Sequence, residues 1–147
     1  MSLMQNNILL SVDQAIKNIT EGFFKLDDED IELTNALGRV TAKPIISRIN
    51  SPSNNVSSMD GYAINSNDFK TKYIIVGESS AGNPFRGKIN PGETVQIFTG
   101  SHLPTNTNTV IIQEKVILKN NKYIELIDKN IIKNQHVRKK GLDFKLG

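Results

Sequence analysis

The sequence predicts a mainly β protein that begins with one amphipathic helix. Apolar residues recur at helical spacing near the N-terminus, whereas from Tyr62 onward short apolar or alternating runs are separated by turn residues. Aromatic residues make up 6% of the 147 residues and Trp is absent, so the core must consist of Ile, Val and Leu. Because such a core is thin, we expect the chain to dock against further polypeptide.

The helix is predicted over the stretch SVDQAIKNITEGFF, which starts at Ser11. Val12, Ile16 and Ile19 recur at helical spacing and form an apolar stripe. Ser11, followed three residues later by Gln14, fits a capping box that satisfies two backbone N–H groups. The surface that covers the stripe need not lie within this chain.

Downstream segments carry turn and strand signals. A helical turn is expected over residues 34–37, ended by Gly38 in a left-handed conformation. Strands are expected over residues 72–79 and 94–100, and NPGE (residues 90–93) fits a type II turn. The run TVIIQEKVILKNNKYIELI predicts a single hairpin over residues 109–127, which turns at Asn120-Asn121.

Composition excludes several classes of site. Cysteine is absent, which rules out disulfides, thiolate metal sites and cysteine nucleophiles. No apolar run approaches the length of a membrane span and the N-terminus does not resemble a signal peptide, so we expect a cytoplasmic protein without membrane contact. Residues 115–147 carry 9 Lys/Arg against 3 Asp/Glu. We interpret these lysines as solvation of exposed strands, because no aromatic residues alternate with them to stack on nucleic-acid bases.

The segment SSMDGYAI, residues 57–64, contains the first candidate site residue. Asp60-Gly61 is a common turn pair, but the same turn can hold the Asp60 carboxylate at the rim of a pocket. Ser58 can bind phosphate or cap the turn. From spacing alone, the ordinary turn is the favoured interpretation.

Three further positions leave alternatives open. Thr99-Gly100 is either an ordinary strand end or a hydroxyl beside an open backbone that a ligand can approach. Glu114 is either a solvated strand residue or a further carboxylate ligand. Asp143 follows the basic run that starts at Arg138, so the two form a structural ion pair, or else the acid faces a metal while the arginine reaches phosphate.

These segments also resemble a known family. SSMDGYAI resembles the SAMDGYAV-type segment of the MoeA family of molybdenum-cofactor proteins, whose animal relative is gephyrin. Five more family elements occur in the same order: ALGRVTAKPI, AGNPFRG after Gly77, PGETVQIFTGSHLP, NTVIIQE and VRKKGLDFKLG. The resemblance covers residues 11–147. The chain departs from the family at Ser101-His102, where Ala-Pro is usual, and at Leu142, where Glu is usual.

The resemblance implies a fold and an activity. It implies the N-terminal region of a longer protein, in which a helical segment (residues 1–26) packs on other parts of that protein. Residues 27–147 would then form an irregular, curved-sheet or barrel-like β module. The implied activity is that of a molybdopterin molybdotransferase, which inserts molybdate into adenylylated molybdopterin and releases AMP with the help of Mg²⁺. The complete protein would be a homodimer acting on this small molecule and not on nucleic acid, and the isolated fragment is expected to be inactive.

The resemblance also implies roles for individual residues, and it leaves one alternative function. Matched positions carry the catalytic roles to Asp60, Thr99 and Asp143. The substrate-binding roles fall on Ser58, Gly61, Gly100 and Arg138, and the Mg²⁺ ligands on Asp60 and Glu114. The alternative is a protein-binding scaffold module, as in gephyrin, without catalysis of its own.

Overall fold

The computed structural model describes residues 9–24 and 26–147. Contacts between residues divide the chain into two units, Met1–Ile45 and Ile46–Gly147, which are described separately below. The predicted parts 1–26 and 27–147 concern packing within a longer protein and stay a prediction. Among the helices formed by the described residues, none has the length and apolar character needed to cross a bilayer.

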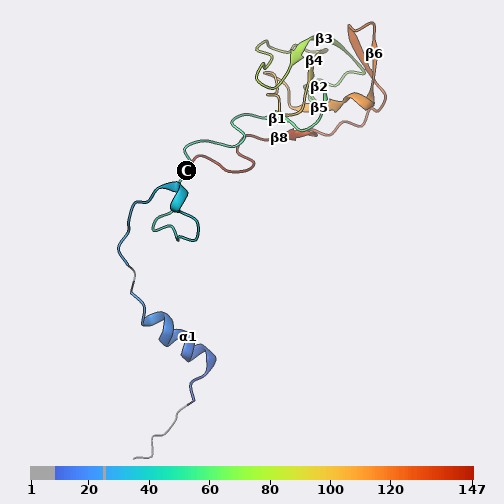
Figure 1. Ribbon diagram of the computed structural model, residues 1–147. Coiled ribbons are helices and arrows are strands. Elements are labelled where there is room, and N and C mark those ends of the chain that lie inside the picture. The colour runs from blue at the N-terminus through green and yellow to red at the C-terminus, as the bar shows by residue number, and fades with distance from the viewer. Residues whose placement is uncertain (1–8, 25) are drawn as a thin grey trace, which may run out of the picture. The chain divides into compact units, whose positions relative to one another are not determined.

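Unit Met1–Ile45 contains the helix α1 (Val12–Glu21), drawn in blue in Figure 1. The predicted capping box is confirmed, because the Gln14 N–H donates to the Ser11 hydroxyl (3.2 Å) and the Ser11 N–H donates to the Gln14 side chain (3.0 Å). The apolar stripe is exposed, with Ile16 at 54% and Ile19 at 60% of full exposure. No described residue of this unit is buried.

A short 3-10 helix follows in the same unit. It is η1 (Leu33–Asn35), which begins one residue earlier than the predicted turn. Gly38 has φ +80°, as predicted for a residue that ends such a turn in the left-handed region. Arg39 then pairs with Glu29, so that the chain after η1 folds back toward the chain before it.

Unit Ile46–Gly147 is built on one six-stranded sheet with the strand order β5-β2-β4-β3-β7-β6. Neighbouring strands are antiparallel except β3 and β4, which run parallel. The mainly β prediction is thus confirmed. The strands are β2 (Gly61–Ile64), β3 (Lys72–Ser79), β4 (Glu93–Ile97), β5 (Thr109–Ile112), β6 (Val116–Lys119) and β7 (Tyr123–Leu126).

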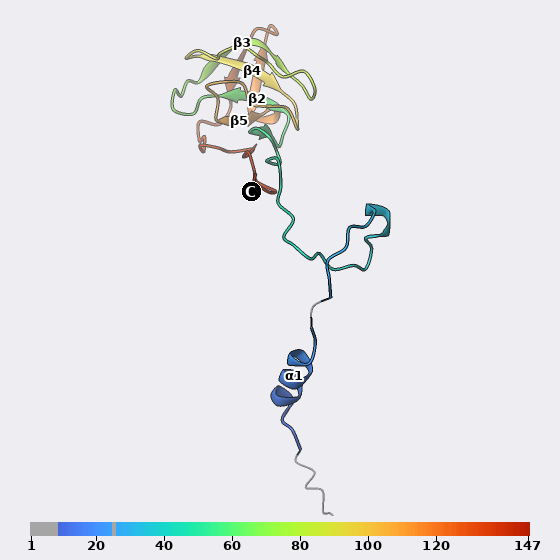
Figure 2. The same cartoon turned by 90° about the vertical axis from the view of Figure 1, so that its left-hand side faces the viewer.

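The sheet must curl because its two edge strands are close in sequence. β5 and β6 lie at opposite edges, yet only the 3-10 helix η2 (Gln113–Lys115) separates them. The link from Ile112 to Val116 can span at most about 14 Å, whereas the outer strands of a flat six-stranded sheet lie about 24 Å apart. The strands therefore wrap into the half-barrel that Figure 2 shows. The curved-sheet expectation is confirmed.

The same closure makes the predicted hairpin over residues 109–127 wrong in its first part. β5 pairs with β2, and only β6 and β7 form a hairpin. Its turn is placed as predicted, because Asn120 (φ 52°) and Asn121 (φ 53°) are both left-handed. Alternation alone identified the strands but could not distinguish their partners.

The core lies entirely in unit Ile46–Gly147 among the described residues and is mostly aliphatic, as expected. It has two clusters on the curled sheet. The large side chains with 0–1% exposure are Ile64, Tyr73, Val95, Ile97, Val110 and Ile124.

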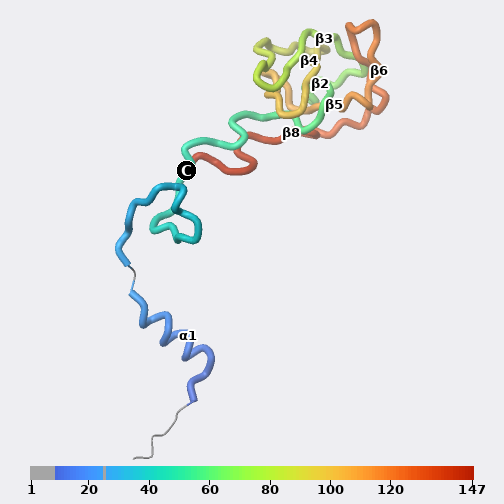
Figure 3. The backbone as a smooth tube through the Cα atoms, viewed as in Figure 1, coloured from blue at the N-terminus to red at the C-terminus, as the bar shows by residue number. Residues whose placement is uncertain are grey.

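The two ends of unit Ile46–Gly147 run side by side as a stem, which we define as residues 47–57 and 137–147. Within it, β1 (Val56–Ser57) pairs with β8 (Val137–Arg138). Ser51 bridges to Phe144, and the Gly147 N–H donates to the Ser47 carbonyl over 3.0 Å. Figure 3 shows the two segments as adjacent green and red tubes. The chain thus enters and leaves this unit at one place.

The AGNPFRG loop connects β3 to β4 and is held by an aromatic ring. A Cβ atom at Gly77 would lie 2.6 Å from the Phe85 ring, and one at Gly87 would lie 2.5 Å from it. The Ser79 hydroxyl accepts from the Phe85 N–H (3.2 Å) and donates to the His102 carbonyl (3.0 Å). Gly77 and Gly87 therefore make room for one ring.

Gly61 should tolerate no side chain, because β2 lies between β4 and β5 and a Cβ atom at Gly61 would lie 2.0 Å from the Ile111 carbonyl oxygen. We expect Gly61→Ala to lower the free energy of unfolding by about 3 kcal/mol or more, because backbone would have to move. The matched control is Gly92→Ala, which meets no atom within 4 Å and carries only the strain of φ +79°, about 1–2 kcal/mol. Equal losses for both variants in urea unfolding would contradict this account.

Candidate active site

Asp60 and Thr99 are brought together by the register of two neighbouring strands. Gly61, the first residue of β2, lies opposite Ile97, the last residue of β4. The residue before β2 and the residues after β4 therefore meet where these two neighbouring strands end. There Asp60 Oδ1 accepts two hydrogen bonds from Thr99, one from its N–H and one from its hydroxyl, both 2.8 Å long.

These two bonds set the electrostatics of the pair. They lower the pKa of the Asp60 carboxyl below its usual value, first through the backbone N–H of Thr99 and then through its hydroxyl. Both residues are exposed. Because the hydroxyl proton of Thr99 is donated to Asp60, the oxygen lone pairs stay available to a cation or a further donor. The pair therefore presents an ionised carboxylate beside an acceptor hydroxyl.

The turn that carries Asp60 is fixed from both sides. The buried Ser57 hydroxyl donates to the Met59 carbonyl over 2.6 Å and accepts from the Met59 N–H, so this serine caps the turn. On one side, the backbone carbonyl of Ser57 accepts from the Gly100 N–H in the loop after β4 (2.8 Å). On the other side, the Ser58 N–H donates to the His136 carbonyl just before β8 (3.0 Å). Ser58 is thus tied through its backbone.

The two glycines named from the resemblance have different surroundings. The space where a Gly61 side chain would lie is filled by the neighbouring strand, so this residue serves packing. Gly100 has φ +82° and nothing within 4 Å of its Cβ position. It therefore permits the left-handed turn after Thr99 and leaves the space beside it open.

Glu114 lies near the turn but carries no shared interaction with Asp60. It is an exposed residue of η2, and its neighbour Gln113 donates its N–H to the Asp60 carbonyl over 3.2 Å. Within residues 9–24 and 26–147, no three His, Cys, Asp or Glu side chains group so as to hold a metal. A metal beside Asp60 would need ligands other than a cluster of His, Cys, Asp or Glu side chains from the described residues.

Arg138 and Asp143 form a separate cluster in the stem. Nη2 of Arg138 donates to both carboxylate oxygens of Asp143, at 2.9 and 3.1 Å. The Ser51 hydroxyl donates to Asp143 Oδ2 over 3.1 Å. Of the two sequence alternatives, this geometry matches the structural ion pair. Sequence reasoning missed Ser51, which lies 92 positions from Asp143, and no local pattern could have identified it.

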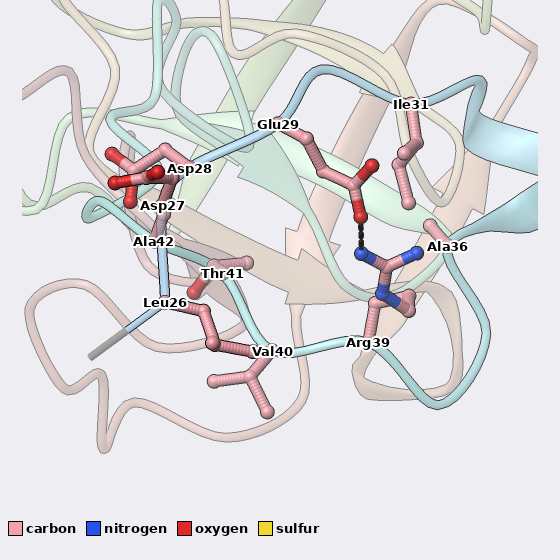
Figure 4. A pocket seen from close by; sticks show the side chains of 10 residues that line it. All are labelled: Leu26, Asp27, Asp28, Glu29, Ile31, Ala36, Arg39, Val40, Thr41 and Ala42. Atoms are coloured by element: carbon pink, nitrogen blue, oxygen red, sulfur yellow. Dashed lines mark hydrogen bonds and ion pairs between the residues drawn. The ribbon is translucent and has the colours of Figure 1, made fainter. Parts of the chain in front are cut away.

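Two of the hollows formed by the described residues lie elsewhere, and Asp60 lines neither of them. One, of about 560 Å³, lies within residues 26–42 and is drawn in Figure 4, where Arg39 points to Glu29. The other, of about 410 Å³, is lined by polar and apolar residues that include Asn55, Phe85 and His102. The Asp60–Thr99 pair is instead exposed at the ends of β2 and β4, so the prediction of a pocket rim there stays a prediction.

Replacing Thr99 should raise the pKa of Asp60. Thr99→Val removes the hydroxyl donor and keeps the N–H, so we expect the pKa of Asp60 to move part of the way toward 3.8. The Asp60 carboxylate of the variant should therefore become protonated at a higher pH than that of the parent. Carboxyl chemical shifts followed by NMR through an acid titration measure this. Thr99→Ser, which keeps the hydroxyl, should leave the pKa low, and an unchanged pKa in Thr99→Val would contradict the assignment.

The Ser101 hydroxyl should be dispensable for stability. Ser101 is 1% exposed and its Oγ has no hydrogen-bond partner among the described residues. We expect Ser101→Ala to leave the free energy of unfolding unchanged or to raise it by about 1 kcal/mol, because an unsatisfied polar group is removed. Ser79→Ala is the matched control: it removes a buried hydroxyl with two hydrogen bonds and should cost about 1–2 kcal/mol. Equal losses in both variants would mean that Ser101 has a partner.

Comparisons with known proteins agree with the fold and the motifs. The family model described as the MoeA N-terminal region (domain I and II) matches residues 10–147. The molybdopterin molybdenumtransferase of Haemophilus influenzae is 37% identical over 143 residues, which cover 95% of this chain and 35% of that protein. Gephyrin of Dictyostelium discoideum is 30% identical over 151 residues, covering 91% and 20%.

A solved structure gives the same result. The molybdopterin biosynthesis MoeA protein of Pyrococcus horikoshii superposes with a TM-score of 0.77 at 28% identity, over 92% of this chain and 37% of that one. This chain thus spans about a third of the length of the molybdopterin molybdenumtransferase that it matches in Haemophilus influenzae. With residues 10–147 matched by one family model, the chain belongs to the family of MoeA N-terminal regions, domains I and II.

Proposed function

We propose that this chain acts in molybdenum-cofactor biosynthesis as one wall of the active site of a molybdopterin molybdotransferase. The reaction would insert molybdate into adenylylated molybdopterin and release AMP. The names of its relatives, molybdopterin molybdenumtransferase among them, support the reaction class. The observation that carries the proposal for this chain is the exposed Asp60 carboxylate, which two donors of Thr99 hold in its ionised form.

The residues present fit a partial Mg²⁺ site. Asp60 offers Oδ2, which receives no hydrogen bond from the described residues, and Thr99 offers its hydroxyl lone pairs. Mg²⁺ is usually bound by one or two carboxylates together with substrate phosphates and water, which agrees with the lack of a three-ligand cluster in the described residues. A bound Mg²⁺ would neutralise charge on the phosphates of the adenylylated substrate. Glu114 remains a candidate second carboxylate.

The roles of this chain's own residues follow from their geometry. Asp60 would bind the cation or orient a water molecule beside the phosphate bridge, and Thr99 would keep it ionised and fix its rotamer. Gly100 leaves open space within 4 Å of its Cβ position, which gives a ligand access to the Thr99 hydroxyl. Arg138 and Asp143 satisfy each other, which favours a role other than direct contact with substrate.

The site would be completed by polypeptide outside this chain. The chain spans 35% of the Haemophilus influenzae relative, and Asp60 lies on an open edge. We propose that the opposite wall comes from the rest of a homodimeric cytoplasmic protein, and that the α1 stripe of Val12, Ile16 and Ile19 packs on other parts of that protein. The alternative is a scaffold role for this chain, in which the same stripe binds a partner protein. The similarity to gephyrin supports it.

The decisive variant is Asp60→Asn in the complete reading frame that encodes this chain. It removes the charge while preserving shape, so we expect AMP release from adenylylated molybdopterin to fall on the order of 100-fold, with an unchanged unfolding midpoint.

Asp128→Asn is the matched control, because Asp128 is also exposed and also has its pKa lowered by a backbone N–H, that of Asn130. Its AMP release should equal that of the parent. If Asp60→Asn released AMP as fast as the control, the catalytic assignment would be wrong. The scaffold alternative predicts instead that Ile16→Asp with Ile19→Asp loses a partner protein in pull-down while AMP release persists.

A further inference from the structure

We propose that Ser51, Arg138 and Asp143 form a clasp across the stem that positions the Asp60 turn, so that Asp143 is a positioning residue and does not touch substrate. This inference rests on the proposed function for its activity readout. It assigns a role to Ser51 and changes the role that the resemblance implied for Arg138 and Asp143.

Each carboxylate oxygen of Asp143 is already engaged. Oδ1 accepts from Arg138 at 2.9 Å, and Oδ2 accepts from both Arg138 and Ser51 at 3.1 Å. The backbone completes the clasp, because the Asp143 N–H donates to the Ser51 carbonyl over 2.9 Å. Partners on two different segments of the stem thus hold this carboxylate, and three of its about four acceptor sites are occupied.

A local turn aims Asp143 at these partners. The Leu142 N–H donates to the Lys139 carbonyl over 3.1 Å, and Gly141 has φ +70°, which is the left-handed value a type II turn requires at its third residue. The chain therefore reverses directly after Arg138 and returns Asp143 to it. Leu142, where the family usually has Glu, is 60% exposed at this turn and takes no part in the clasp.

Two steps of hydrogen bonding connect the clasp to the candidate active site. Arg138 lies in β8 opposite Val56 of β1. Two residues after Val56, the Ser58 N–H donates to the His136 carbonyl. The backbone carbonyl of Ser57 then accepts from the N–H of Gly100, the residue that directly follows Thr99. Displacement of β8 would thus shift the Asp60 turn on one side and the Thr99 loop on the other.

The Arg138–Asp143 ion pair contributes more to the positioning of the stem than to the free energy of folding. The Arg138 and Asp143 side chains are 48% and 42% exposed, and an ion pair of this exposure contributes about 0–1 kcal/mol to folding. The pair is nevertheless held by two bonds from one guanidinium nitrogen and by a hydroxyl from the other strand of the stem. Its effect is to fix the register of the stem beside the Asp60 turn.

Amide hydrogen exchange on residues 1–147 tests the clasp without any assay of activity. In Asp143→Asn and in Ser51→Ala, the amides of Ser58 and Gly100 should exchange about tenfold faster than in the parent. The amide of Ile74, which donates to the Gly92 carbonyl in the sheet, should be unchanged and is the internal control. Unchanged exchange at both Ser58 and Gly100 would overturn the proposal.

A charge exchange in the complete reading frame tests the role in activity. Arg138→Asp and Asp143→Arg alone should each lower kcat for AMP release about 10- to 100-fold with KM within about threefold of the parent. The double exchange should recover at least tenfold of that loss, because the pair is re-formed with reversed polarity. A double exchange that has the parent's unfolding midpoint and activity no better than the worse single variant would show direct action on the substrate and overturn the proposal.

The two tests separate this inference from the proposed function. If the parent releases no AMP, or if Asp60→Asn releases it normally, the proposed function fails and the exchange rates still decide the clasp. If Asp60→Asn is inactive but the Ser58 and Gly100 amides are insensitive to Asp143→Asn, the clasp fails and the proposed function stands.

Discussion

The close backbone approach at Gly61 is the constraint on which the site depends. β2 is hydrogen-bonded to β4 on one side and to β5 on the other, and the Ile111 carbonyl occupies the space of a side chain at Gly61. With β2 locked in this register, Gly61 faces Ile97, and the residues just outside the paired region are Asp60 and Thr99. The position of the carboxylate is therefore a consequence of strand packing and not of the turn alone.

Two of the hydrogen-bonded acids, Asp60 and Asp143, have opposite electrostatic surroundings. Asp60 receives neutral donors from Thr99, which lower its pKa, while its exposed carboxylate has no ion-pair partner among the described residues. Asp143 receives a guanidinium, so its charge is neutralised and both of its oxygens are engaged. An ionised carboxylate without a cationic partner can attract a cation, whereas one paired with a guanidinium mainly fixes geometry. This contrast underlies the proposed roles of Asp60 as a reacting group and of Asp143 as a supporting group, although the sequence offers both as aspartates beside polar residues.

Buried side chains are unevenly distributed between the two units. All buried described residues lie in unit Ile46–Gly147, while the described residues of unit Met1–Ile45 leave the apolar stripe of α1 exposed. The stem gathers both ends of the folded unit at one place, where the Gly147 N–H meets the Ser47 carbonyl. A unit attached in this way can present one open edge to neighbouring polypeptide while its own core stays intact. Such an arrangement agrees with a chain that spans about a third of the Haemophilus influenzae relative.

Sequence alone determined the features that depend on a few neighbouring residues. The capping box of α1, the left-handed Gly38 and the Asn120-Asn121 turn follow from local backbone preferences, which act within three or four positions. Family motifs also singled out Asp60 and Thr99. Only the tertiary structure decided that β5 leaves β6 for the opposite edge, that Thr99 donates to Asp60 across 39 positions, and that Ser51 meets Asp143 across 92. Alternating hydrophobicity marks a strand but carries no information about its partner, because pairing is chosen by burial of the whole curled sheet.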